Sequence, residues 1–161
     1  MTPAEYNSAV NNHSDGLYRF VLKLSRDEEL ARDLVQDAFE KAWIKREDVA
    51  AEKIKSYLFT SVYNAFVDYT RKQKRKHDYE GSILPGASYS PSQPDLNEVL
   101  QKALNQLPDV QRSCVLLRDY EGYDYKEIGE ILKLSESQVK VYIFRARQHL
   151  QKIIGKLEAV L

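Results

Sequence analysis

Residues 135–151, SESQVKVYIFRARQHLQ, combine cations with side chains that can meet a DNA groove. Val139, Ile143, Ala146 and Leu150 share one face at helical spacing, and that face must pack inward. The opposite face carries Ser137, Lys140, Val141, Phe144 and Gln148, flanked by Arg145 and Arg147. The first residues of such a helix can reach base edges in the major groove, while its arginines neutralise phosphates. A solvated basic face is the alternative interpretation.

A second polar stripe follows one face of residues 53–75. It consists of Lys53, Tyr57, Thr60, Asn64, Asp68, Arg71 and Arg75. Such side chains, ending in the basic run 71–77, suit strand-separated DNA, because bases stack on aromatic rings and cations follow the backbone. Alternatively, Tyr63, Phe66 and Tyr69 are core aromatics, and the basic run is a solvated helix end favoured by the helix dipole.

A third stripe is acidic. Asp33, Asp37 and Glu40 recur at helical spacing beside Gln36, and Trp43 follows one turn later. Like charges at this spacing repel each other by a few tenths of a kcal/mol per pair, so an isolated helix does not favour them. The stripe is either a solvated face or a docking face for a basic partner.

Helix start signals indicate the elements that position these residues. DLNE (95–98), DYKE (124–127) and SESQ (135–138) each place a capping residue three positions before Glu or Gln. Together with Pro108 as a first-turn proline and Gly122 as a stop, they predict helices near 96–106, 109–121, 125–132 and 136–157. Helices are also expected near 3–24, 27–45 and 53–75, with a loop over 45–52.

The segment 78–94 is rich in glycine, proline and serine and carries no helical period. It predicts a flexible linker between two small all-α domains. These are an N-terminal bundle of three to four helices over 1–77 and a C-terminal four-helix domain over 95–161. The helices at 125–132 and 136–157, joined by a tight turn, read as a helix-turn-helix.

Charge is balanced in sum and segregated along the chain. The 161 residues hold 24 basic and 24 acidic side chains, whereas a free-standing DNA-binding protein normally has a basic excess. Residues 27–40 and 119–130 are acidic, and 71–77 and 140–156 are basic. The sequence assigns no function to the acidic residues at 119–130.

No catalytic constellation is visible in the sequence. His13, His77 and His149 are scattered, without metal-ligand spacing among themselves or with Cys114, and no glycine-rich phosphate loop occurs. We therefore expect neither an enzyme nor a cofactor. The single cysteine is expected to be a buried thiol, and the lack of a signal peptide or a long apolar run predicts a cytoplasmic protein.

Three runs together resemble the extracytoplasmic-function (ECF) sigma factors of the sigma-70 family, which are specificity subunits of bacterial RNA polymerase. They are DLVQDAFEKAW (33–43), SYLFTSVYNAFVDYTRKQKR (56–75) and the long run 104–150. The resemblance implies core RNA polymerase as partner, through its clamp helices and flap, together with promoter DNA and an anti-sigma factor. The resemblance also explains the zero net charge, because in such proteins the core enzyme supplies most of the contacts with DNA phosphates. Weak DNA binding by the free subunit is therefore expected.

The resemblance also assigns residues to roles. Asp33, Gln36, Asp37, Glu40 and Trp43 correspond to the segment that docks on polymerase. Tyr57, Thr60, Asn64, Asp68, Arg71 and Arg75 correspond to the helix that engages the −10 element and helps to open the duplex. Ser137, Lys140, Val141, Phe144, Arg145 and Arg147 correspond to the helix that reads the −35 element. The loop 46–52 resembles the loop that captures a flipped base.

Two departures from the family pattern stand out. Val141 and Tyr142 occupy positions where serine and arginine are common, which predicts a different −35 preference. Gly129 replaces the usual alanine, and glycine is expected to weaken its helix by up to about 1 kcal/mol. A helix-turn-helix regulator that binds DNA without polymerase is the alternative function, and a helical adaptor without DNA contact is a third.

Overall fold

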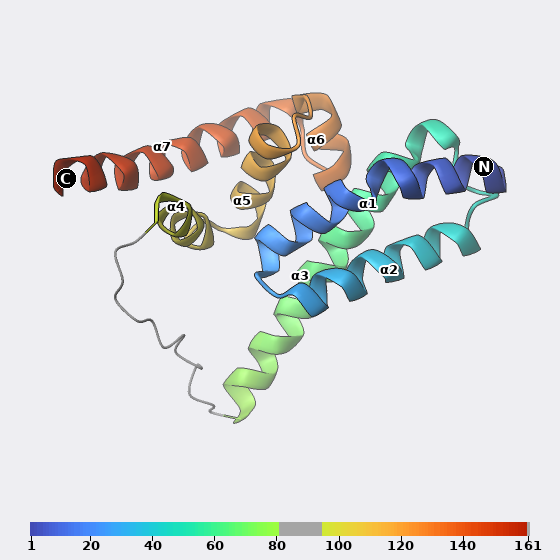
Figure 1. The fold of residues 1–161 in the computed structure, drawn as a ribbon, viewed down its shortest axis with the longest axis horizontal. Coiled ribbons are helices and arrows are strands. Elements are labelled where there is room, and N and C mark those ends of the chain that lie inside the picture. Colours follow the sequence, from blue (N-terminus) through green and yellow to red (C-terminus); the bar gives the residue numbers. More distant parts are fainter. Residues whose placement is uncertain (81–94, 161) are drawn as a thin grey trace.

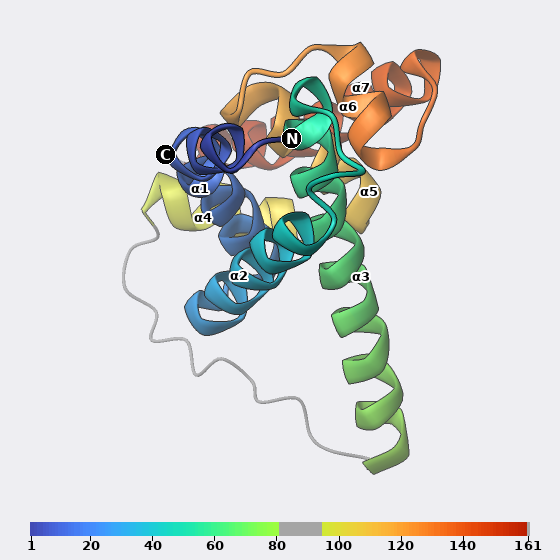
Figure 2. The ribbon, with the colours of Figure 1, turned by 90° about the vertical axis from the view of Figure 1, so that its right-hand side faces the viewer.

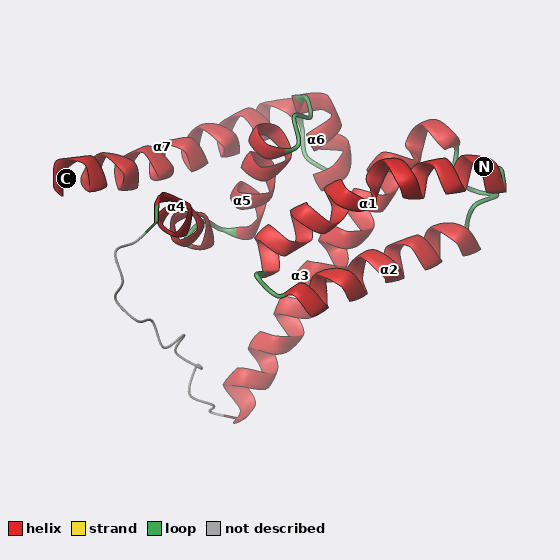
Figure 3. Ribbon diagram, viewed as in Figure 1, coloured by secondary structure: helices red, strands yellow, loops and turns green. Residues whose placement is uncertain are grey.

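The computed structural model describes residues 1–80 and 95–160, and within these ranges every regular element is helical (Figures 1 and 3). The N-terminal half contains α1 (Pro3–Ser25), α2 (Glu28–Ile44), η1 (Ala51–Lys53) and α3 (Ile54–Glu80). The C-terminal half contains α4 (Leu96–Asn105), α5 (Asp109–Val115), its π-helical continuation η2 (Leu116–Tyr120), α6 (Tyr125–Leu132) and α7 (Glu136–Val160). The all-α prediction is confirmed. Residues 78–80 of the expected linker continue α3, and 81–94 lie outside the described residues.

Side-chain caps begin the helices close to the predicted positions. Ser135 and Gln138 form a complete capping box, since each side chain accepts a hydrogen bond from the other's backbone N–H at 3.1 and 2.9 Å. Asp124 accepts from the Glu127 N–H at 2.8 Å. Asp95 accepts from Asn97 rather than from Glu98, at 3.3 Å, so its cap differs from the predicted box. Gly122 ends the preceding helix with a φ of +76°, a conformation that glycine adopts without strain.

The N-terminal half is a bundle in which α1, α2 and α3 pack against one another. Its core includes Leu17, Phe20, Leu58, Phe59 and Val62, all at most 1% exposed. The last turns of α3 leave this bundle and project from the body of the protein (Figure 2). Residues 71–76 are all exposed there, so the basic run lies on the projecting part of the helix.

The C-terminal half wraps α5, α6 and α4 around the long helix α7. Val139, Ile143 and Ala146 of α7 are buried, as are Ile128 and Ile131 of α6, and the two helices pack together as the helix-turn-helix prediction requires. Cys114 of α5 is fully buried, and burial raises the pKa of its thiol to about 12. The predicted buried thiol is confirmed.

The two halves also pack directly against each other. Helix α3 contacts α6, and α1 contacts α5 and η2, so the buried residues of both halves form one continuous apolar core. The linker composition alone does not predict this contact, because it says only that the halves can move apart.

Gly129 has a steric role that its helix propensity conceals. A Cβ at this position would lie 2.6 Å from the carbonyl oxygen of Leu134, inside the turn between α6 and α7. The Leu134 N–H in turn donates to the Gly129 carbonyl at 2.9 Å, so the turn folds tightly back onto the helix. The backbone would have to shift to accept alanine. The expectation that glycine only weakens this helix therefore misses the main effect.

We expect Gly129→Ala to lower the free energy of unfolding by about 1–3 kcal/mol, because the added methyl group overpacks against backbone. Gly155→Ala in α7 is the matched control: nothing lies within 4 Å of its Cβ, so this helical position should gain up to about 1 kcal/mol. Urea unfolding followed by circular dichroism measures both. Equal stabilisation by the two substitutions would contradict the steric role.

Candidate nucleic-acid interface

The outer face of α7 is exposed, as the sequence predicts. Phe144 is 61% exposed and Val141 is 44% exposed, which is unusual for apolar side chains beside a well-packed core. Ser137, Lys140 and Arg145 are also exposed on this helix, and Ser137, Val141 and Arg145 line one shallow pocket. The helix therefore presents an apolar and cationic surface next to the turn of the helix-turn-helix.

Arg147 differs from the other residues predicted to contact the −35 element, because it forms an ion pair within the protein. Its guanidinium donates two hydrogen bonds to the Asp119 carboxylate, at 2.6 and 3.2 Å. This interaction raises the pKa of Arg147 and places its charge at the junction of α7 and η2. Lys140 is also partly engaged, since its Nζ lies 5.7 Å from the centre of the Tyr125 ring. Both cations remain exposed.

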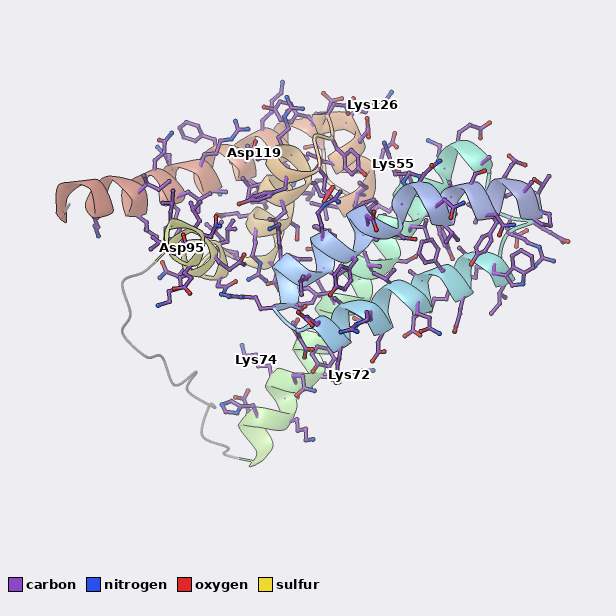
Figure 4. All side chains as sticks on the ribbon, viewed as in Figure 1. Lys55, Lys72, Lys74, Asp95, Asp119 and Lys126 are labelled. Atoms are coloured by element: carbon purple, nitrogen blue, oxygen red, sulfur yellow. The ribbon has the colours of Figure 1, made fainter. Side chains whose placement is uncertain are left out.

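The predicted −10 residues share one face of α3, but their accessibility changes along the helix. Tyr57 and Thr60 are half-buried, whereas Asn64, Asp68, Arg71 and Arg75 are exposed. The neighbouring face, with Leu58, Val62 and Phe66 buried, packs in the core as predicted. Figure 4 shows Lys72 and Lys74 on the projecting end of the helix, away from the bundle.

The N-terminal part of this stripe lines a groove between α3 and α6. Tyr57, Thr60 and Asn64 line the groove from α3, and Glu130 and Lys133 line it from the C-terminal half. The Thr60 hydroxyl donates a 2.8 Å hydrogen bond to the Ile131 carbonyl. The structure thus brings one −10 residue into contact with the other half of the protein.

The predicted docking residues lie together on one exposed face of α2. Asp33, Gln36, Asp37 and Glu40 are exposed, and the Gln36 amide donates to Glu40 at 3.3 Å. Trp43, 39% exposed, ends this face.

Aromatic and cationic contacts hold the Trp43 ring in place. Its centroid lies 5.0 Å from that of Tyr6, and the Arg46 guanidinium stacks 4.0 Å from its centre. Ile44 beside it is 77% exposed. The predicted docking residues did not include Ile44 and Arg46, although their position next to Trp43 at a helix end was an available signal.

The loop after α2 is tied down at both ends. The N-terminal ammonium donates to the Arg46 carbonyl at 2.8 Å, and Val49 is buried. Residues 45–50 therefore form an ordered connection between α2 and η1. The sequence predicts a base-capturing loop over 46–52, whose last two residues the structure places in η1.

The described residues contain no group of three or more His, Cys, Asp or Glu side chains placed to hold a metal ion. Within the same ranges, no helix is long and apolar enough to cross a bilayer.

Comparison with known proteins assigns both halves. Residues 9–76 match the family described as sigma-70 region 2, and 97–150 match sigma-70, region 4. The ECF RNA polymerase sigma factor SigM of Bacillus subtilis is 36% identical over 149 residues, covering 89% of this chain and 91% of that protein. SigE of Mycolicibacterium smegmatis, also an ECF sigma factor, is 30% identical and covers 94% of this chain and 62% of the longer relative.

A solved structure shares the arrangement of both halves. It is the sigma factor RpoE in complex with the anti-sigma factor NepR from Bartonella quintana, with a TM-score of 0.78 and 30% identity over 93% of this chain and 96% of that one. Fold and sequence thus define a sigma-70 type protein with regions 2 and 4. The chain belongs to the ECF RNA polymerase sigma factors, which are transcription initiation factors.

Phe144→Ala should change the free energy of unfolding by no more than about 0.5 kcal/mol, because the ring contributes little to packing. Its neighbour Ile143, 2% exposed, is the matched control, and Ile143→Ala should cost about 2–5 kcal/mol. Thermal and urea unfolding distinguish the two. A large stability loss for Phe144→Ala would mean that the ring is structural and not available to a partner.

Proposed function

We propose that this sigma factor uses three separate surfaces, each assigned to one step of initiation. The exposed α2 face with Asp37 and Trp43 docks on the polymerase clamp helices. The polar face of α3 engages the −10 element and helps to separate its strands. The outer face of α7 reads the −35 element. The protein acts by binding and performs no chemistry of its own, in the cytoplasm with the polymerase.

One observation carries the assignment of α7. Phe144 and Val141 remain exposed on a helix whose other face is fully packed, so burial does not explain the two apolar side chains. An apolar contact with a thymine methyl group and arginine contacts with guanine or phosphate both suit such a surface. The alternative function, a helix-turn-helix regulator that acts without polymerase, would also use this α7 surface. It would give no role to the exposed α2 face or to the polar stripe of α3.

An anti-sigma factor is a proposed third partner. The solved relative with the same arrangement of both halves is bound to such a protein. A partner that holds this arrangement would keep the half-buried part of the α3 stripe in its groove.

Two paired variants test the surfaces in reconstituted initiation with core polymerase and a promoter selected from random duplexes. Asp37→Ala with Trp43→Ala should weaken polymerase binding by about tenfold or more, because the aromatic anchor of Trp43 and the negative charge of Asp37 are both lost. Lys140→Glu with Arg145→Glu should keep polymerase binding and lower initiation on promoters that depend on the upstream element.

Each paired variant is the control for the other. Polymerase binding is read by native gel or fluorescence anisotropy, and initiation is read by transcript yield. The proposal fails if the α7 variant initiates normally, or if the free protein opens or shifts promoter DNA equally well without polymerase.

A further inference from the structure

The acidic segment 119–130, left without a role by the promoter assignments, has a use in the structure. It contains Asp119, Glu121, Asp124, Glu127 and Glu130. Asp124 caps α6, and Asp119 pairs with Arg147 of its own half. The other three carboxylates all pair with cations of the N-terminal half.

These three pairs join the two halves along α1 and α3. Arg19 donates to Glu121 through Nε and Nη2, at 3.0 and 2.9 Å, and the Glu121 side chain is only 5% exposed. Lys55 pairs with Glu127, and Lys53 Nζ lies 3.9 Å from Glu130. Figure 4 shows Lys55 on the side of the N-terminal half that faces α6.

Neutral contacts complete the surface. The Phe59 and Tyr123 rings meet edge to face with centroids 5.3 Å apart, and Thr60 donates to the Ile131 carbonyl. Lys55 Nζ also lies 4.4 Å from the centre of the Tyr123 ring. We call this set of contacts, from Arg19, Lys53, Lys55, Phe59 and Thr60 to 121–131, the closing interface.

The closing interface covers only the start of the −10 surface, at Thr60; the rest of that surface, from position 64 onward, and the −35 surface stay open. Thr60 is occupied by a carbonyl of α6, and Lys53 and Lys55 are paired with carboxylates, whose anionic oxygens resemble those of a phosphate. Ser137, Val141 and Phe144 of α7 remain exposed in the same arrangement. The two DNA-facing surfaces are therefore not equally available.

We propose that α6 is an internal inhibitor of the −10 surface. In the free protein its carboxylates substitute for DNA phosphates against η1 and the first turn of α3, and strand capture requires α6 to leave. This inference rests on the proposed role of α3, and it needs no second protein to hold the halves together.

The ion pairs of the closing interface suit a reversible contact. Lys53 and Glu130 are 67% and 41% exposed, and pairs of this kind are weak and screened by salt. Among the carboxylates and cations of these pairs, only Glu121 is deeply covered. When only the open state binds, the observed affinity is the affinity of the open state multiplied by the fraction of molecules that are open. Breaking these pairs raises that fraction and should therefore strengthen the binding of single-stranded DNA.

A reversible crosslink tests whether opening is required. Ser56 Oγ and Glu130 Oε2 lie 3.5 Å apart, so Ser56→Cys with Glu130→Cys can be joined by a short thiol-reactive reagent that contains a cleavable disulfide. The crosslinked protein should lose promoter opening with core polymerase by about tenfold or more and regain it on reduction. Wild type treated with the same reagent is the control, since its one thiol, Cys114, is buried.

The outcomes separate this inference from the proposed function. Full promoter opening by the crosslinked protein overturns the internal inhibitor. Absence of opening by both the reduced variant and wild type would instead overturn the proposed function.

Charge reversal tests the closing interface in the free protein. Glu127→Lys with Glu130→Lys should raise the radius of gyration in X-ray scattering above the value of about 15 Å expected for a compact chain of this length. It should also increase affinity for a random single-stranded DNA pool by about fivefold relative to the control. Glu28→Lys with Glu29→Lys, on the exposed first turn of α2, makes the same charge change away from the closing interface.

Circular dichroism verifies that both charge variants are folded. A Glu127→Lys and Glu130→Lys protein that keeps the wild-type radius, and binds DNA no better than the control, overturns the proposal.

Discussion

Phe59 is the side chain on which the arrangement of the protein depends. Its ring is fully buried, with Phe20 of α1 at 5.7 Å between centroids and Tyr123 of the C-terminal half at 5.3 Å. One aromatic residue therefore belongs to the core of the N-terminal bundle and to the contact between the halves. Because Phe59 directly precedes Thr60, packing of this ring also fixes how closely α6 approaches the −10 surface.

The balanced charge of the chain has a structural counterpart. Acidic and basic segments that are far apart in sequence meet in space, as Arg19 and Glu121 do across 102 positions. Cations that would otherwise attract any polyanion are thus satisfied within the protein. The basic end of α3 is different, since residues 71–76 project into solvent, and it gives the molecule a local positive surface despite its neutral total.

Much of the fold follows from local sequence signals. The Ser135 capping box, the Asp124 cap and the turn at Gly122 act within a few residues, so helix starts and the helix-turn-helix were predictable. The exposed faces of α2 and α7 also followed from helical periodicity. The predicted −10, −35 and polymerase contacts themselves stay predictions.

What could not be predicted depends on contacts between distant residues. The acids at 119–130 show no pattern that names Lys53, Lys55 or Arg19 as partners, and periodicity did not reveal that Arg147 binds Asp119. The role of Gly129 was hidden for the same reason: its steric limit is the Leu134 carbonyl in the following turn, whereas helix propensity considers only its own helix.

The burial of Cys114 limits what this protein can sense. A thiol reacts with oxidants as the thiolate, and here the only cysteine is fully covered and its pKa is raised to about 12. The folded chain therefore offers no group for disulfide exchange or sulfenic acid formation near neutral pH. A response of this factor to redox conditions would therefore not start at Cys114 while the C-terminal core stays folded.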